Sequence, residues 1–185
     1  MKHLLLVVSG PSGVGKGTVV KKLLEDGNYA LSVSCTTRAP RDGEKDGEAY
    51  FFISREEFLN MIESGGLLEY SNHFENYYGT PKKFVEDKLK DFDVILEIEV
   101  DGALQAKKSY PDAVLIMILP PSIEELHARL EKRHSETEDK IEERMKRMAY
   151  EVSKKDEYDY IVINDDLSST IKEIENIIER ERGLK

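Results

Sequence analysis

An aliphatic run that leads directly into a glycine-rich turn constrains this chain more than any other feature. Leu4–Val8 is continuously apolar, as in a strand buried on both faces of a parallel sheet. Gly10–Lys16 follows with the sequence Gly-Pro-Ser-Gly-Val-Gly-Lys, and we expect a helix over Lys16–Glu25 that Gly27 can end. The order of strand, glycine turn and helix predicts an α/β fold with the turn at the end of a central strand.

The glycine-rich turn matches the pattern G-x-x-x-x-G-K and predicts a phosphate-binding loop. Its glycines let backbone N–H groups point inward, the helix start adds partial positive charge, and Lys16 supplies a full charge. An ordinary β–α turn is the alternative, but the flanking strand and helix argue against it. The residues expected to contact a nucleotide here are Gly10, Pro11, Ser12, Gly13, Val14, Gly15, Lys16, Gly17 and Thr18.

One position departs from the usual form of this loop. Gly17 follows the lysine where Ser or Thr ordinarily offers a hydroxyl to Mg²⁺, and Thr18 comes one residue later. We therefore expect magnesium to be held mostly by nucleotide phosphates and water, with Thr18 as a candidate ligand. The sequence Gly-Lys-Gly-Thr resembles the loop of nucleoside-monophosphate kinases, which narrows the expected class to small phosphotransferases.

Strand and helix patterns alternate along the rest of the chain. Apolar runs predict strands at 30–34, 92–98, 113–119 and 160–163, and the helices between them indicate right-handed βαβ units. Residues 35–84 break this rhythm with turns and aromatic residues. We expect a five-stranded parallel sheet flanked by helices. The expected parts are a core of residues 1–33, 85–121 and 156–185, an inserted mixed α+β lobe at 34–84 and a charged helical pair at 122–155.

Composition excludes several classes of function. Lys and Arg total 27 against 37 Asp and Glu, so the net charge of −10 repels a nucleic-acid backbone. The single cysteine, Cys35, cannot form an internal disulfide, and no zinc-ligand spacing is present. The apolar run over residues 3–9 is far too short to span a membrane, and no signal-peptide cleavage site follows it. We therefore expect a cytoplasmic protein with neither nucleic-acid nor membrane partners.

A second group of candidate anion-binding residues lies in the inserted lobe. Arg38 and Arg41 are three residues apart on a loop stiffened by Pro40, so their forked N–H donors can converge on one phosphate. Tyr50 can add a hydroxyl donor. Taken singly, the two arginines are equally well explained as solvated loop charges and the tyrosine as a packing residue.

The features that carry a family resemblance are, in order, the loop with Arg38 and Arg41, Glu69, Tyr77-Tyr78-Gly79-Thr80 and Asn164-Asp165-Asp166. With them the chain resembles the guanylate kinase family over nearly its whole length. The resemblance implies an α/β P-loop kinase fold with an acceptor-binding lobe and a helical lid. It implies that Glu69 accepts hydrogen bonds from guanine N1–H and the exocyclic amino group, a donor pair that adenine lacks. The implied acceptor site comprises Ser34, Arg38, Arg41, Tyr50, Glu69, Tyr78, Thr80, Glu97 and Glu99.

The resemblance also covers the charged helical pair and the end of the chain. Arg133 and Arg144 match arginines that the family's lid brings to the transferring phosphate, and Arg147 lies one helical turn beyond. Asn164 is implied to contact the donor adenine. At Asp101 the family more often has glutamine, so no role is carried over to that position.

The implied reaction transfers the γ-phosphoryl group of ATP directly, in line, to GMP or dGMP, with Mg²⁺ and without a covalent enzyme intermediate. Its expected catalytic residues are Lys16, Arg38, Arg41, Arg133 and Arg144, and Glu97 is a second candidate magnesium ligand. Two alternatives stay open: another nucleoside-monophosphate kinase, and a related module that binds partner proteins without catalysis. We expect a monomer or a homodimer.

Overall fold

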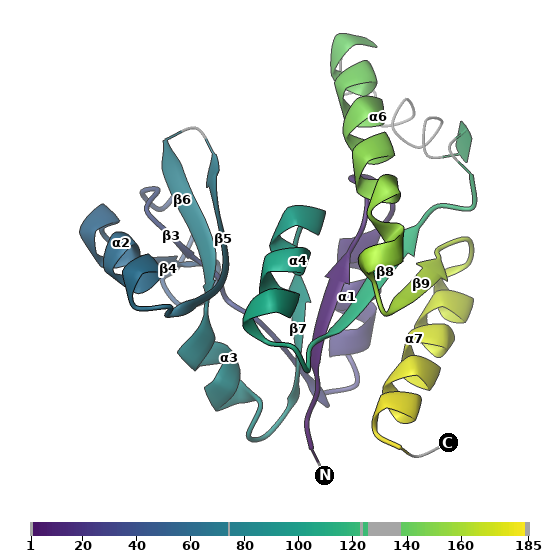
Figure 1. Ribbon diagram of the computed structural model, residues 1–185, viewed down its shortest axis with the longest axis horizontal. Coiled ribbons are helices and arrows are strands. Elements are labelled where there is room, and N and C mark those ends of the chain that lie inside the picture. Colours follow the sequence, from purple (N-terminus) through teal and green to yellow (C-terminus); the bar gives the residue numbers. More distant parts are fainter. Residues whose placement is uncertain (1, 74, 123, 126–137, 184–185) are drawn as a thin grey trace.

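A five-stranded parallel sheet forms the centre of the computed structural model, which describes residues 2–73, 75–122, 124–125 and 138–183 (Figure 1). Its strand order, β2–β7–β1–β8–β9, places the strand before the glycine-rich loop in the middle. This confirms the predicted sheet. The strands are β1 (Leu5–Ser9), β2 (Tyr29–Leu31), β7 (Asp93–Glu97), β8 (Val114–Leu119) and β9 (Tyr160–Ile163).

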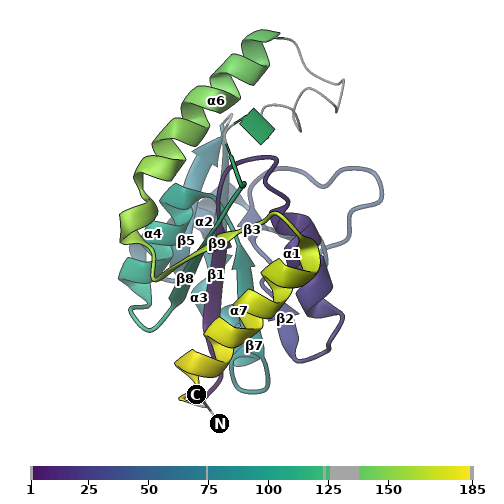
Figure 2. The ribbon, with the colours of Figure 1, turned by 90° about the vertical axis from the view of Figure 1, so that its right-hand side faces the viewer.

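Helices cover both faces of this sheet because its strands are apolar on both sides. In β1, Leu6 and Val8 face the cluster with helices α1 (Lys16–Leu24) and α7 (Leu167–Glu181), which lie near each other in Figure 2. Leu5 and Val7 face the opposite cluster, which includes residues of α3 (Lys82–Lys88) and α4 (Val100–Ser109). The alternation of side chains along β1 thus divides the core into two layers.

The inserted lobe contains a second sheet, which lies on the left in Figure 1. Its small core is built around Cys35, Phe58 and Leu67. A capping box begins the helix of this lobe, because Ser54 Oγ accepts from Glu57 N at 3.1 Å and Ser54 N donates to Glu57 Oε2 at 2.8 Å. The elements of the lobe are β3 (Cys35–Thr36), β4 (Phe51–Phe52), α2 (Arg55–Glu63), β5 (Leu67–His73) and β6 (Asn76–Pro81), with strand order β4–β3–β6–β5.

The structure refines the expected bounds of the lobe and its strands. The predicted strand at 30–34 ends at Leu31, and the chain leaves the main sheet before β3. Strands β3 and β6 carry no distinct apolar pattern of their own. They are strands because they pair with neighbouring strands. The expected boundary between residues 84 and 85 falls inside α3, where Val85 packs into the main core.

The charged region that follows β8 is described in part. Ser122 Oγ accepts a hydrogen bond from Glu125 N at 3.1 Å. Helix α6 (Glu138–Ser153) rises above the carboxyl end of the sheet (Figure 1), and a short 3₁₀ turn (Lys155–Glu157) leads from it toward β9. Among the residues that the structure describes, no helix is both long enough and apolar enough to cross a bilayer.

Candidate functional site

The glycine-rich loop after β1 lines a cavity of about 780 Å³, here called the donor cavity. All the predicted loop residues face this cavity except Pro11 and Val14, which are buried beneath it. Lys16 Nζ donates to the carbonyl oxygens of Gly10 and Pro11, the latter at 3.1 Å. Burial lowers the pKa of Lys16, and attraction to Glu151 and Glu97 partly offsets that shift. The ammonium group therefore lies among backbone dipoles at the position expected for a phosphate-binding lysine.

Two of the loop glycines occupy positions that no other residue fits. Gly10 has φ +143°, and a Cβ there would lie 2.1 Å from the carbonyl oxygen of Ile118 in β8. Gly15 has φ +99°, and its Cβ would lie 2.7 Å from Asn164 Nδ2. Both the left-handed backbone and the close neighbours exclude a side chain. The fold thus requires glycine at these positions for the loop to approach the sheet edge.

Asn164 supports this loop from beneath. It follows β9, is 8% exposed, and donates from Nδ2 to the carbonyl oxygen of Val14 at 2.7 Å. Its Oδ1 accepts from Thr170 Oγ1 at 3.1 Å. Asn164 is absent from the lining of the donor cavity as described, so its predicted contact with adenine stays a prediction.

A second cavity of about 510 Å³, the acceptor cavity, lies between the inserted lobe and the sheet edge. Glu69 from β5 lies on its wall and is only 7% exposed. Its Oε1 accepts from the buried Thr80 Oγ1 at 2.6 Å, and burial raises the pKa of the carboxyl group. Gly102 makes room for it, since a Cβ there would lie 3.1 Å from Glu69 Oε2. The predicted residues that line this cavity are Ser34, Tyr50, Glu69, Tyr78, Glu97 and Glu99.

The predicted phosphate-binding arginines, Arg38 and Arg41, are not among the residues that line this cavity. The Arg38 guanidinium lies 5.5 Å from the centre of the Tyr50 ring, and the Tyr50 and Tyr78 rings meet edge to face at 5.9 Å. Arg38 is paired with Glu44. The side chain of Arg41 is exposed, and its backbone N–H donates to Glu44 at 2.8 Å.

The donor and acceptor cavities share one wall. Glu97, Ile98 and Glu99, at the carboxyl end of β7, line both. A Cβ at Gly17 would lie 3.4 Å from Glu97 Oε1, so this carboxylate stands next to the position where related loops carry a hydroxyl residue. Parallel α/β sheets bind ligands at this end of their strands. Two adjoining cavities with a common acidic wall can place two phosphorylated ligands end to end.

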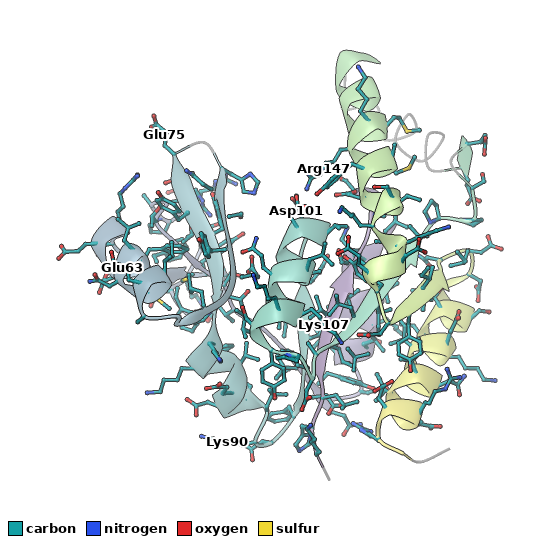
Figure 3. All side chains as sticks on the ribbon, in the orientation of Figure 1. Glu63, Glu75, Lys90, Asp101, Lys107 and Arg147 are labelled. Atoms are coloured by element: carbon teal, nitrogen blue, oxygen red, sulfur yellow. The ribbon has the colours of Figure 1, made fainter. Side chains whose placement is uncertain are left out.

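Helix α6 is joined to the site by contacts that the sequence did not indicate. Arg147 donates to Asp101 Oδ2 at 2.8 Å and pairs with Glu99 at 3.4 Å and with Glu151 at 3.3 Å. Tyr150 Oη donates to Asp101 Oδ1 at 2.6 Å. Figure 3 shows Arg147 above Asp101, at the top of α4. These contacts tie α6 to the start of α4, where Asp101 lies.

Asp101→Asn should therefore lower thermal stability slightly. Tyr150 and Arg147 hold the pKa of Asp101 below its ordinary value of 3.8. The stabilisation is thus present above that pH and is lost as the pH falls below it. A partly exposed contact of this kind contributes about 1 kcal/mol, which lowers the melting temperature by about 2–4 °C. Calorimetry at neutral pH checks this, with Asp91→Asn, in an exposed turn, as control. Equal melting temperatures for both variants would show that the contacts add nothing.

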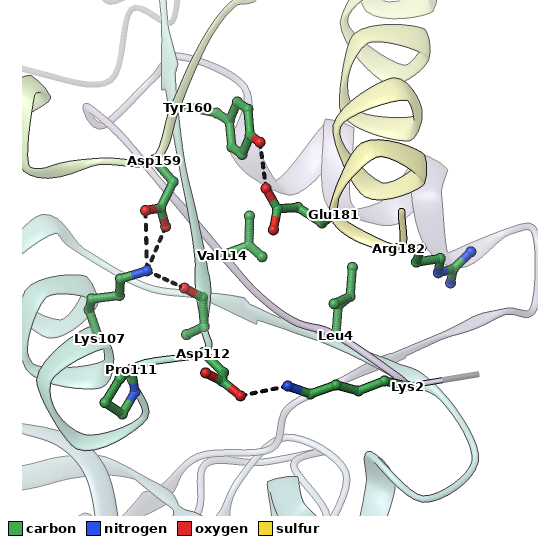
Figure 4. A pocket seen from close by; sticks show the side chains of 11 residues that line it. Lys2, Leu4, Lys107, Pro111, Asp112, Val114, Asp159, Tyr160, Glu181 and Arg182 are labelled. Atoms are coloured by element: carbon green, nitrogen blue, oxygen red, sulfur yellow. Dashed lines mark hydrogen bonds and ion pairs between the residues drawn. The ribbon is translucent and has the colours of Figure 1, made fainter. Parts of the chain in front are cut away.

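A further cavity of about 680 Å³ lies at the opposite end of the sheet, where Leu4, Val114 and Tyr160 mark the amino ends of strands (Figure 4). Its charged side chains have partners, and that of Arg182 is the buried Asp93, outside the cavity. Lys107 Nζ lies 2.8 Å from Asp159 Oδ2 and donates to the Ala113 carbonyl at 2.7 Å. The pairs Lys2–Asp112 and Tyr160–Glu181 complete the set drawn in Figure 4. The glycine-rich loop lies at the other end of the sheet, after the carboxyl end of β1.

Sequence reasoning did not assign every residue of the two cavities. Glu151 is buried at 4% exposure beside the donor cavity, and no motif indicated it. Ser71, His73 and Gln105 line the acceptor cavity, and only their place in the fold shows this. Arg133 lies outside the described residues, and for Arg144 the structure describes only the backbone, in α6. In the part of the chain that is described, no group of three or more His, Cys, Asp or Glu side chains can hold a metal ion.

Comparison with known proteins agrees with this arrangement. The family model described as guanylate kinase matches residues 2–181. A guanylate kinase of Clostridioides difficile (strain 630) is 52% identical over 184 residues, covering 98% of this chain and 90% of the relative. One of Clostridium tetani (strain Massachusetts / E88) is 48% identical over 182 residues, covering 98% and 88%. The crystal structure of guanylate kinase from Anaplasma phagocytophilum matches with a TM-score of 0.71 and 40% identity, over 97% of this chain and 86% of that one. The chain therefore belongs to the guanylate kinase family.

Proposed function

We propose that this protein transfers the γ-phosphoryl group of ATP to GMP or dGMP and forms ADP and GDP. One observation carries the proposal: a phosphate-binding loop and a cavity with a buried carboxylate meet at Glu97–Glu99. The loop with Lys16 would hold the donor triphosphate. Ser34, Glu69 and Thr80 would hold the guanine, and Arg38, Arg41, Tyr50 and Tyr78 would hold its phosphate.

The proposed chemistry needs alignment and charge neutralisation and no general base. The acceptor phosphate is already anionic at neutral pH, so its oxygen can attack directly. Lys16 would stabilise the negative charge on the transferred group, helped by Arg38 on the acceptor side and by Arg133 and Arg144. We propose that residues 122–155 act as a lid that excludes water, over the core and the acceptor lobe at 34–84.

The residues around the loop suit a magnesium ion that arrives with the nucleotide. Thr18 offers a hydroxyl and Glu97 a carboxylate, and oxygen donors of this type suit Mg²⁺, which keeps much of its water. When bound, the ion would neutralise charge on the nucleotide phosphates. Glu97 would hold and orient water near the loop, because its carboxylate stands beside Gly17.

A comparison of acceptors tests the proposed function. GMP and dGMP should be phosphorylated with ATP, while AMP, UMP and dTMP should react at least about a hundredfold more slowly in kcat/KM, because none of these bases offers the buried Glu69 the adjacent N–H and amino donors of guanine. Steady-state assays with each monophosphate at a fixed ATP concentration measure this. Preference for another monophosphate would favour a different kinase of the same class. ATP binding without turnover on any acceptor would favour a binding module.

A further inference from the structure

Glu44 closes the loop that carries both acceptor arginines. Its two carboxylate oxygens receive separate Nη groups of Arg38, each at 3.0 Å. Oε2 also accepts the backbone N–H of Arg41 at 2.8 Å, and the backbone N–H of Glu44 donates to the Arg41 carbonyl at 3.0 Å. The paired side chains of Arg38 and Glu44 are only 15% and 22% exposed. One carboxylate thus fixes the guanidinium of the first arginine and the backbone of the second.

A carboxylate that is paired with a phosphate-binding arginine can have either of two opposite functions. Glu44 can compete with the acceptor phosphate for Arg38, or it can hold Arg38 ready for that phosphate. The geometry separates them. Glu44 takes the terminal edge of the guanidinium, while Arg38 Nη1 also donates to the Ala39 carbonyl at 2.8 Å. The guanidinium also lies 5.5 Å from the centre of the Tyr50 ring, which lines the cavity, and both Glu44 and Tyr78 raise the pKa of Arg38. Arg38 therefore reaches from Glu44 toward the acceptor cavity.

We propose that Glu44 is a positioning residue for the acceptor phosphate. It holds the Arg38 fork, and the backbone at Arg41, in the arrangement that the phosphate needs, so less order has to be created on binding. Two aromatic rings also support this arrangement. The Arg38 guanidinium lies 5.5 Å from the centre of the Tyr50 ring and 5.8 Å from the centre of the Phe52 ring. The inference rests on the proposed function and adds a residue to it that does not touch the substrate.

The test is Glu44→Gln, which keeps the shape of the side chain but loses the charge and one of the two acceptors for the Arg38 fork. The KM for GMP should rise by about tenfold, with kcat at saturating GMP and the KM for ATP each within about twofold of the parent. Glu44→Asp keeps the charge on a shorter side chain, so its KM for GMP should lie between those of the parent and of Glu44→Gln. Glu48→Gln is the matched control, because Glu48 lies on the same loop and its pair with Lys45 is exposed.

Binding of guanosine separates positioning from a general disturbance of the lobe. Guanosine has no phosphate, so its affinity should be unchanged in Glu44→Gln, whereas GMP binding should weaken. Tighter GMP binding in the variant would overturn the proposal and identify Glu44 as a competing anion. An unchanged KM for GMP, or equal losses for GMP, guanosine and ATP, would also overturn it. Failure of the parent protein to phosphorylate GMP would instead contradict the proposed function.

Discussion

Lys16→Ala should lower kcat by about a hundred- to a thousandfold while the protein stays folded. Lys16 is the cation of the phosphate-binding loop, and its ammonium group lies in the donor cavity. Groups that stabilise developing charge in a site contribute about 3–4 kcal/mol each to lowering the barrier. Lys16 Nζ donates to the Gly10 and Pro11 carbonyls, and burial lowers its pKa. Its removal therefore eliminates a partly desolvated charge, and the cost to folding should be small.

Steady-state kinetics and thermal unfolding, measured on the same preparation, check this result. Lys22→Ala is the matched control, because Lys22 lies on the same helix and pairs with Glu25 on the exposed side. That variant should keep the parent's kcat. Near-normal turnover in Lys16→Ala would remove the lysine from the proposed mechanism. A large fall in melting temperature would show that lost folding, and not lost charge stabilisation, lowers the rate.

The central sheet was predictable because its signals are local. The apolar run of β1 and the glycines after it each determine a backbone conformation over a few residues. Strands β3 and β6 were missed for the opposite reason. The two residues of β3 are too few to show a pattern, and β6 is a strand because β5 and β3 pair with it. Strands of this kind are defined by tertiary partners.

The candidate site likewise has a part that the sequence predicts and a part that only the fold brings together. The phosphate loop is one continuous segment, so its chemistry is visible in the order of its residues. The proximity of Arg147 and Glu151 to Glu99 depends on where α6 lies relative to β7, and no local pattern encodes that placement. Gly102 is a similar case, since its role in leaving space for Glu69 appears only when α4 and β5 are seen in contact.

Glu69→Gln should weaken GMP far more than ATP. The carboxylate is buried and can accept both donors of guanine, while Thr80 already donates to one of its oxygens at 2.6 Å. A glutamine side chain has one acceptor oxygen, and its NH₂ group would face a guanine donor. Hydrogen bonds to a charged group contribute about 1.5–3 kcal/mol, so the KM for GMP should rise about ten- to a hundredfold. Equal effects on GMP and ATP would remove Glu69 from base recognition.

Folding should not suffer from this substitution. Burial raises the pKa of Glu69, so the ionised side chain costs free energy of folding at neutral pH. Glutamine removes that buried charge and can still accept from Thr80. The melting temperature at neutral pH should therefore be equal to that of the parent or higher. A lower value would mean that the weaker binding reflects a damaged lobe.

The pH dependence of GMP binding tests the charge itself. The raised pKa means that Glu69 takes up a proton at a higher pH than an ordinary glutamate, whose value is 4.5, and the protonated form can no longer accept both guanine donors. The parent should therefore lose GMP affinity as the pH falls from neutral toward 4.5, and the loss should begin above that value. The phosphate of GMP also titrates, near about pH 6, but it does so equally for parent and variant. The ratio of their KM values for GMP isolates Glu69, and it should be largest at neutral pH and shrink as the pH falls. A ratio that stays constant across this range would show that guanine recognition does not depend on an ionised carboxylate.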